Sequence, residues 1–134
     1  QLTYSANIAI VRAKDKRNGT YLPYIPADRI DHNLRWSFTN SKGHWGKPFL
    51  QVGHRFVAKQ TRYHEDSDYT SPPPSYHLFD AVAGIKYQMA KQSLGLNISV
   101  DNLTNNLYKE YMNRFRYYAH EMGRNITIRL FYNF

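Results

Sequence analysis

The segment Tyr108–Met122, which reads YKEYMNRFRYYAHEM, carries the side chains best suited to contact a ligand. It holds four tyrosines, one phenylalanine, two arginines and one histidine. Aromatic rings and guanidinium groups recur at recognition surfaces, because they offer stacking and bidentate hydrogen bonds. The ligand contacts that we predict in this segment are Arg116, Tyr117, Tyr118 and His120. The same side chains could instead pack against neighbouring loops, and the sequence leaves both interpretations open.

A second polar cluster lies in the segment YHEDSDY, Tyr63–Tyr69, and combines one histidine with three carboxylates. Such a group could hold a hard cation, but it lacks the spacing of a calcium-binding loop. We therefore interpret it as an acidic loop tip in contact with solvent. The chain has no cysteine, and its six histidines form no HExxH pair. Because it also has no glycine-rich phosphate loop and no nucleophile elbow, we predict no catalytic residue, no cofactor and no metal site.

The elements that must position these clusters have the pattern of strands. Apolar and polar residues alternate with a period of two in six segments, and none of these keeps the apolar spacing of a helix. The predicted strands cover residues 2–11, 29–38, 49–59, 79–89, 94–102 and 123–134. One face of the resulting antiparallel up-and-down sheet should carry Ile8, Leu34, Leu50, Ile85, Ile98 and Ile128. The sequence thus predicts an all-β fold with almost no helix.

The connections between the predicted strands alternate between long and short. Long segments follow the first, third and fifth strands, at Lys14–Asp28, His64–His77 and residues 105–122. The second and fourth strands are followed by the shorter Thr39–Lys47 and Lys91–Ser93. Outer-membrane barrels sort their loops in this way, with short turns at the periplasmic rim and long loops outside. A mean hydropathy of -0.68 and 12 tyrosines also suit strands that are apolar on only one face.

Three segments carry a resemblance to a known family. The family is that of the TonB-dependent outer-membrane receptors. A late proline-rich loop and the strand after it in these receptors resemble LPYIPADRIDHNLRWSF. Their penultimate strand resembles LGLNISVDNLTNNLYKEY, and their last strand resembles GRNITIRLFYNF. The resemblance extends over the whole chain, with a departure at Thr104 and Asn105, where the family more often has an aromatic residue and an acid. It implies that residues 1–134 form about the last six strands of a transmembrane barrel of about 22. The plug domain and the earlier strands would precede this segment.

The resemblance also implies a function and a set of partners. The parent protein would be a receptor in the bacterial outer membrane that imports a scarce nutrient chelate, such as a siderophore, haem or cobalamin. Its energy would come through TonB, which contacts the N-terminal part of such receptors. Its other partners would be the rest of the barrel, its plug, the barrel-assembly machinery, and outer-membrane lipid and lipopolysaccharide. Tyr132 and Phe134 would lie at the periplasmic rim and form the signal that the assembly machinery reads.

The polar face of the strands is expected to face the lumen of such a barrel. Its charges could line a path for an anionic ligand, but we favour ion pairs with plug residues or with one another. These residues are Arg35, Arg55, Lys59, Lys86, Arg129, Asp31, Asp80 and Asp101. His54 is an exception, because it falls on the apolar face. A β-bulge near Gly53 would turn its side chain inward.

Two other classes of protein remain open alternatives. A soluble ligand-binding β-barrel would need about eight strands, whereas six strands in an open sheet leave two bare edges. A basic nucleic-acid-binding β module would fit the net charge of +8 and the many aromatic residues. The cations, however, are spread over every segment instead of one face. We therefore predict no nucleic-acid partner.

Overall fold

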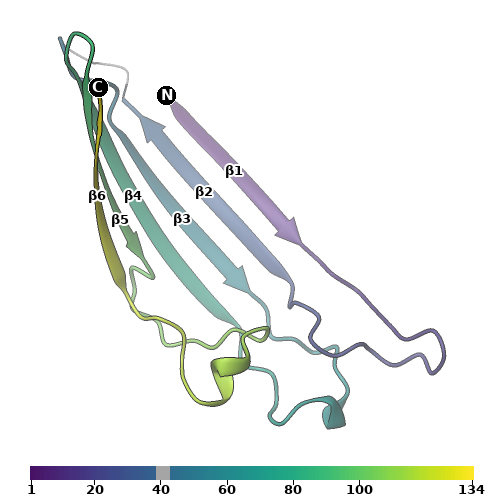
Figure 1. The fold of residues 1–134 in the computed structure, drawn as a ribbon. Helices are drawn as coiled ribbons and strands as arrows, with labels where there is room; N and C mark the ends of the chain where they lie inside the picture. Colours follow the sequence, from purple (N-terminus) through teal and green to yellow (C-terminus); the bar gives the residue numbers. More distant parts are fainter. Residues whose placement is uncertain (39–42) are drawn as a thin grey trace.

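The computed structural model describes residues 1–38 and 43–134, which form a single antiparallel sheet of six strands. The strands lie side by side in chain order from β1 to β6 (Figure 1). They span Leu2–Ala9, Arg29–Ser37, Phe49–Val57, Tyr76–Gln88, Ser93–Asp101 and Asn125–Asn133. Within the described residues, the only helical turns are two short 3-10 helices, η1 at Glu65–Ser67 and η2 at Arg114–Tyr117. The predicted all-β, up-and-down fold is confirmed.

The strand boundaries agree with the sequence pattern to within two residues except at the start of β4. This strand begins at Tyr76, three residues before the predicted start and two residues after Pro74. Proline cannot donate to a ladder, so pairing starts as soon as the run of prolines ends. The added residues find partners on β3, where Tyr76 pairs with Val57 and His77 with Phe56. Part of the predicted turn after β2, residues 39–42, lies outside the described residues.

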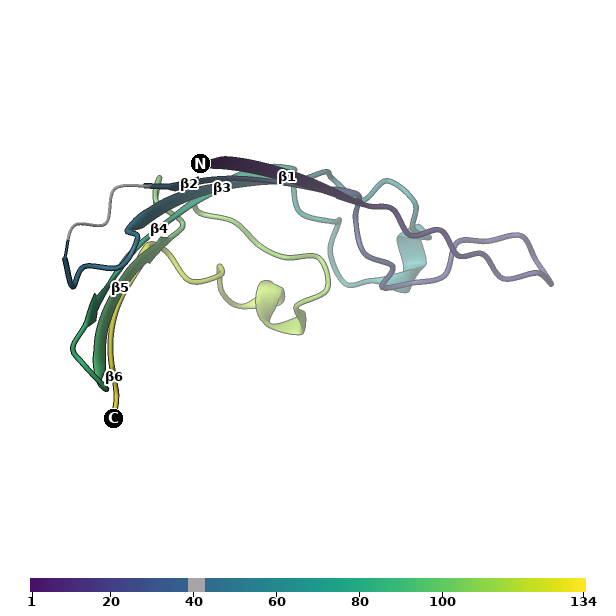
Figure 2. The same ribbon diagram turned by 90° about the horizontal axis from the view of Figure 1, so that it is seen from above.

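The six predicted apolar residues lie on one face of the sheet. Cross-strand pairs place Ile8 opposite Ile30, and Ile98 opposite Ile128. The sheet is curved, and the segment that contains η2 lies on its concave side (Figure 2). The apolar face is the convex one, because Tyr76 and Leu78 point to the opposite face, where they are only 8% and 5% exposed. The Tyr76 ring lies there 4.6 Å from the ring of Tyr108, in the connection that contains η2. Convex side chains remain open to the surroundings, as Ile128 with 69% exposure illustrates.

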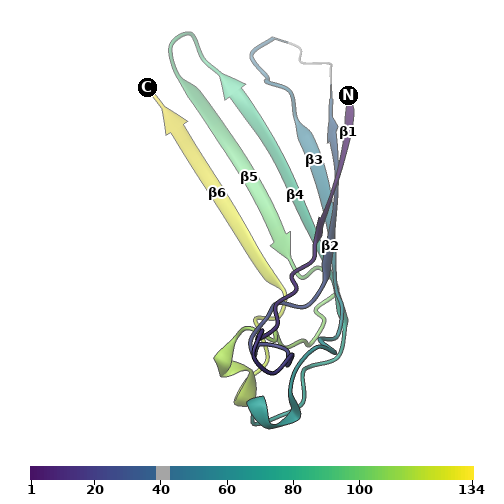
Figure 3. The ribbon, with the colours of Figure 1, turned by 90° about the vertical axis from the view of Figure 1, so that its right-hand side faces the viewer.

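The sheet does not close on itself. β1 pairs only with β2 and β6 only with β5, so one long side of each edge strand has no ladder partner in the described residues. The three long connections lie together at one end of the sheet, which we call the loop end. The described residues of the short connections, 43–48 and 89–92, and both chain termini lie at the opposite end, the turn end (Figures 1 and 3). The predicted sorting of the loops by length is thus confirmed.

Two glycines on the concave face lie beneath phenylalanine rings of neighbouring strands. Gly84 pairs with Phe49, and Gly95 pairs with Phe131. A Cβ atom on Gly95 would lie 1.9 Å from a carbon of the Phe131 ring, so only glycine leaves room for that ring. Glycine in a strand interior often marks such a close approach. The pairing explains why Phe131 occupies a face that is otherwise mostly polar.

The expected bulge at Gly53 is wrong. The ladder runs without interruption through Asn33–Gly53 and Gly53–Asp80, so His54 remains on the convex face. It lies there in a row of polar rings formed by Tyr4, His32, His54 and His77, which we call the histidine row. Hydrogen bonds join Tyr4 Oη to His32 Nδ1 at 2.8 Å and His54 Nε2 to His77 Nδ1 at 3.0 Å. The sheet stays regular because neighbouring side chains form hydrogen bonds with some of the polar ring atoms.

Candidate functional site

The candidate site lies at the loop end, where segments far apart in the sequence meet. Residues 10–28, 58–75 and 102–124 connect the strands there and lie next to one another (Figures 1 and 3). Loops that a rigid sheet positions in this way commonly carry binding residues. The interactions among the three segments therefore decide which side chains are available to a ligand.

The carboxylate of Asp68 is the central connection between two of these segments. Its side chain is 1% exposed and forms an ion pair with Arg116, whose side chain is 3% exposed. The hydroxyl of Tyr117 donates a hydrogen bond to the same carboxylate. This bond raises the pKa of Tyr117, because ionisation would remove the donated proton and place a second negative charge beside Asp68. The contacts join residues 58–75 to residues 102–124.

Aromatic packing brings the first long segment into the same assembly. The ring of Tyr24 stacks on the ring of Tyr111, with 6.3 Å between their centroids. The guanidinium of Arg114 lies 5.7 Å from the Tyr24 ring centroid, and that of Arg116 lies 4.9 Å from the Tyr111 centroid. Burial raises the pKa of Tyr111, which keeps this phenol neutral. These contacts join residues 10–28 to residues 102–124, which the Asp68 ion pair already joins to residues 58–75.

A second set of polar contacts ties residues 10–28 to residues 58–75. Arg12 forms two hydrogen bonds with Asp28, at 2.6 and 2.9 Å, and Arg62 forms one at 2.9 Å. The hydrogen bond from Arg12 is the main cause of a lowered pKa of Asp28. Gln60, which is 1% exposed, donates hydrogen bonds to the carbonyl oxygens of Ile25 and Pro26. These segments therefore form one layer across the end of the sheet.

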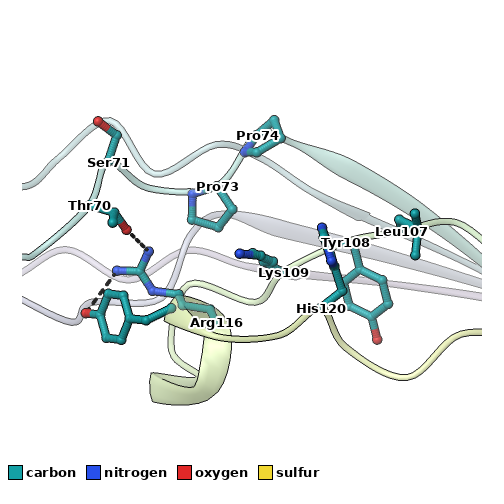
Figure 4. A pocket seen from close by; sticks show the side chains of 10 residues that line it. Thr70, Ser71, Pro73, Pro74, Leu107, Tyr108, Lys109, Arg116 and His120 are labelled. Carbon is teal, nitrogen blue, oxygen red and sulfur yellow. Dashed lines mark hydrogen bonds between the residues drawn. The ribbon is translucent and has the colours of Figure 1, made fainter.

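A pocket of about 260 Å³ opens between the second and third segments. One wall consists of Thr70, Ser71, Pro73 and Pro74, and the other of Leu107, Tyr108, Lys109, Arg116, Tyr117 and His120 (Figure 4). Arg116 Nη1 is 3.4 Å from the hydroxyl of Thr70, whereas its buried Nε has no hydrogen-bond partner. Among the described residues, neither Lys109 nor His120 forms an ion pair with a carboxylate. The pocket thus offers positive charge beside apolar rings.

The four predicted contact residues occupy different positions around this pocket. His120 is exposed and lines it. Arg116 and Tyr117 also line it, but both are bound to Asp68. Tyr118 is 89% exposed and does not belong to the lining residues. The structure therefore brings three of the four together, and a direct contact between any of them and a ligand stays a prediction.

Sequence reasoning missed the role of Asp68. The sequence predicts that Tyr63–Tyr69 is an acidic loop tip in contact with solvent. This prediction is right for Asp66, whose side chain is 94% exposed, and wrong for Asp68, whose side chain is 1% exposed. No local pattern distinguishes the two carboxylates, because the partner of Asp68 lies 48 positions further along the chain. Lys109 and the wall formed by Pro73 and Pro74 were also missed. Only the folding of two distant loops places them together.

The charges on the concave face are partly paired with one another. Asp31 accepts one hydrogen bond from Arg55 at 2.8 Å and forms an ion pair with Arg29 at 2.9 Å. Asp80 accepts a hydrogen bond from the backbone of Asn102, and the guanidinium of Arg35 lies 3.8 Å from the Phe49 ring centroid. These contacts agree with the interpretation that the charges serve packing and pairing.

Aromatic residues gather at the turn end, opposite the pocket. Trp36 stacks on Phe38 with 4.6 Å between ring centroids, and Trp45 meets Tyr87 edge-on at 4.8 Å. Tyr132 lies 6.3 Å from Phe134, which is 97% exposed. Rings in such a band suit a boundary between apolar and aqueous surroundings. Whether Tyr132 and Phe134 act as an assembly signal stays a prediction.

Two further features bear on the class of protein. Within residues 1–38 and 43–134, no helix is long and apolar enough to cross a membrane. The same residues contain no cluster of three or more histidine, cysteine or acidic side chains suited to hold a metal ion. The chain instead offers a curved sheet with an apolar convex face, a polar concave face, an aromatic band and loops sorted by length. These features define a segment of a transmembrane β-barrel.

Comparison with known proteins identifies the family. Residues 1–103 match the family described as TonB dependent receptor-like, beta-barrel. The chain therefore belongs to the TonB-dependent receptor β-barrel family, whose members are outer-membrane receptors and transporters rather than enzymes. No curated protein and no solved structure matches the chain.

Proposed function

We propose that this chain is about the last six strands of a larger receptor barrel in the bacterial outer membrane, which imports a nutrient chelate with energy coupled through TonB. Membership of the family supports this proposal. The open sheet supports it too, because both edge strands offer unpaired donors and acceptors to further strands. The loop end would then face outward and the turn end would face the periplasm. Neither alternative, a soluble β-barrel or a nucleic-acid module, agrees with the family match.

The observation that carries the proposed ligand site is the pocket at the loop end. Its lining combines the Tyr108 ring, the prolines and the side chains of Lys109 and His120. Because Arg116 is already paired with Asp68, we assign the recognition of acidic groups to Lys109, with His120 as a further hydrogen-bonding side chain. Such a lining suits an anionic, ring-bearing chelate, since cations bind its acidic groups and rings stack on its planar parts. Siderophores and haem have this chemistry.

The test is ligand binding to the complete receptor in detergent, with ferric siderophores, haem and cobalamin as separate probes. Replacing both Lys109 and His120 with alanine is expected to weaken binding of the recognised probe by about 1–3 kcal/mol, the cost of losing a few anchors. Replacing Lys16, an exposed lysine of another long segment, serves as the matched control. Tyr118→Ala tests the exposed ring separately.

Arg116 needs a different test, because it is buried and not an exposed loop residue. Arg116→Ala would leave the Asp68 carboxylate buried without its ion pair, which typically costs about 3–5 kcal/mol. That change is expected to disorder the loops as well as the pocket. Barrel mobility in gels with and without heating reports whether the strands still fold. Unchanged affinity in the Lys109 and His120 variant, with an intact barrel, would contradict the proposed site and leave the family assignment standing.

A further inference from the structure

An apolar groove lies on the convex face at the turn end, at the far end of the sheet from the candidate ligand pocket. It has a volume of about 350 Å³ and is lined by Trp45, Ile85, Tyr87, Leu94, Leu96 and Leu130. The lining comes from β4, β5, β6 and the connection before β3. Cross-strand pairs between Tyr87 and Leu94 and between Leu96 and Leu130 hold these side chains on one face. No ionisable cation or carboxylate belongs to the lining.

One wall of the groove is the Trp45 side chain, which is held in place because the connection before β3 is hydrogen-bonded to the end of β4. Gly46 N donates to Lys86 O and Gln88 N donates to His44 O, both at 2.6 Å. These bonds place Trp45 opposite Tyr87 as an isolated bridge, with the two rings packed edge to face. The indole is thus fixed by backbone bonds and ring packing. The groove is a built feature of the sheet end and does not depend on one mobile side chain.

The ionisable side chains described beside the groove are basic. The described parts of the two short connections, residues 43–48 and 89–92, contain Lys47, Lys91 and His44 but no acidic residue. Lys91 lies at the tip of a tight turn that is closed by two hydrogen bonds between Met89 and Gln92. Lys47 follows Trp45 by two residues and is exposed, as is Lys91. Positive charge therefore lies next to an apolar groove, at the level of the aromatic band.

We infer that this groove and its lysine rim bind an anionic phospholipid of the periplasmic leaflet. One acyl chain occupies the groove between Trp45 and Leu130, and the phosphate lies against Lys47 and Lys91. The inference rests on the proposed function, which places the turn end at the periplasmic face of an outer-membrane barrel. The occupant follows from complementarity: an apolar chain matches the lining, and a negative headgroup matches the two lysines described beside it.

Headgroup charge, more than the acyl chain, decides the selectivity of this site. An acyl chain that enters the groove leaves one apolar environment for another, so it gains packing but no hydrophobic free energy. Lysines at the edge of a membrane attract anionic headgroups with an energy that corresponds to about a fivefold change in affinity for each lysine. Phosphatidylglycerol should therefore bind better than phosphatidylethanolamine with the same chains.

The experiment uses the complete receptor, stripped of lipid in detergent and titrated with phosphatidylglycerol or phosphatidylethanolamine of identical acyl chains. Native mass spectrometry then measures the fraction of receptor that holds one lipid. The double variant Lys47→Gln/Lys91→Gln removes the charged rim and keeps the groove. The matched control, Lys16→Gln/Arg17→Gln, removes two exposed cations at the loop end. Trp45→Ala removes the indole that lines the groove and keeps the charges.

The expected result is a preference for phosphatidylglycerol that falls by roughly 10- to 25-fold in the Lys47 and Lys91 variant. The Lys16 and Arg17 control should keep that preference, and Trp45→Ala should weaken both lipids alike. Equal binding of the two lipids to the wild type, or a preference that survives loss of both lysines, would overturn the inference and indicate ordinary annular lipid. Ligand binding at the loop end is measured on the same samples, so that failure of the lipid site is distinguished from failure of the proposed function.

Discussion

At the scale of single residues, the histidine row is the clearest departure from the expected pattern. Three imidazoles and one phenol lie on a face that is otherwise apolar, yet two of the contacts in the row are hydrogen bonds. The rings of His32 and His54 are also parallel, with centroids 5.7 Å apart. In surroundings without water, a polar group is tolerated when a neighbour satisfies it. The polar rings of the row therefore stabilise one another, and the effect of each ring on the free energy of unfolding depends on whether its partner is present.

This dependence predicts different outcomes for single and paired changes in the row. His77→Ala should lower the free energy of unfolding by about 1–2 kcal/mol, because His54 Nε2 loses its partner on a lipid-facing surface. Replacing both His54 and His77 with leucine should be nearly neutral, since no unsatisfied group remains. Denaturant unfolding of the complete barrel in lipid vesicles measures both, with His120→Ala as the control. If the variant with leucine at both positions lost as much free energy of unfolding as His77→Ala, the pairing of His54 with His77 would be contradicted.

Asp28 gives a residue-level prediction about pH. Its pKa is lowered chiefly by the hydrogen bond from Arg12, so it is more acidic in the folded chain than in the unfolded one. Its contribution to stability is therefore complete above its ordinary pKa, near 4, and is lost as the pH falls through the lowered value. Below about pH 4, hydrogen exchange in residues 12–28 should accelerate relative to intrinsic rates.

The control for this prediction is Asp28→Asn, which cannot ionise. Its segment 12–28 should already be loosened at pH 6 and should change less on acidification. Other carboxylates titrate in the same range, so only the difference between wild type and variant reports on Asp28. Equal acid sensitivity in the two proteins would show that other groups hold the loop.

At the scale of elements, the pairing of β5 with β6 depends on contacts that alternate between the two faces. The convex face contributes aliphatic pairs such as Ile98 with Ile128, whereas the concave face contributes the Phe131 ring above Gly95. An aromatic ring that covers a glycine shields its backbone and fixes the register of the two strands. A slip of one residue would bring Phe131 opposite a residue with a Cβ atom and turn the apolar face inward.

Gly95→Ala should consequently destabilise the complete barrel. The new Cβ would lie within 2 Å of the Phe131 ring, which forces the ring to move, and such overpacking costs about 1–3 kcal/mol. Adding Phe131→Leu should recover part of this loss because it removes the obstructing atoms. The recovery is measured as the coupling free energy of a double-mutant cycle. Additive effects of the two changes would exclude the contact as the cause.

At the scale of the whole molecule, the chain is a curved sheet with one wet face, one apolar face and two unpaired edges. The exposed aliphatic side chains of the convex face include Leu2, Ile8, Ile126, Ile128 and Leu130, each between 62% and 69% exposed. A contiguous apolar surface of this kind is covered by lipid or by other protein. The loop segments, by contrast, bury Arg116, Gln60 and Asn102 through contacts within the described chain.

The isolated chain is therefore expected to need detergent to stay monodisperse. Without detergent, the apolar convex face and the free edges of β1 and β6 should drive association through burial and strand pairing. Light scattering of the purified chain across the critical micelle concentration measures this. A chain that remains monomeric in buffer alone would contradict the membrane-facing assignment of the convex face.

Much of this architecture was predictable from local patterns. Period-two alternation is a property of neighbouring residues, so the six strands, their faces and the sorting of loops by length followed from the sequence alone. The resemblance also placed Tyr132 and Phe134 at the rim that carries the short turns, and the C-terminus lies at that end of the sheet (Figure 1). The family match agrees with the resemblance carried by three short segments.

The loop-end pocket and the histidine row were decided only by tertiary structure. Asp68 was indistinguishable from its acidic neighbours until the fold brought Arg116 to it from 48 positions away. His54 had the same parity as its apolar neighbours, but only the register of three strands showed that His32 and His77 lie beside it. Alternation along a strand is set by local backbone geometry, whereas contacts between loops and across strands depend on which distant segments the folded sheet holds together. For this reason the sequence alone determined the sheet, and the tertiary structure determined the site.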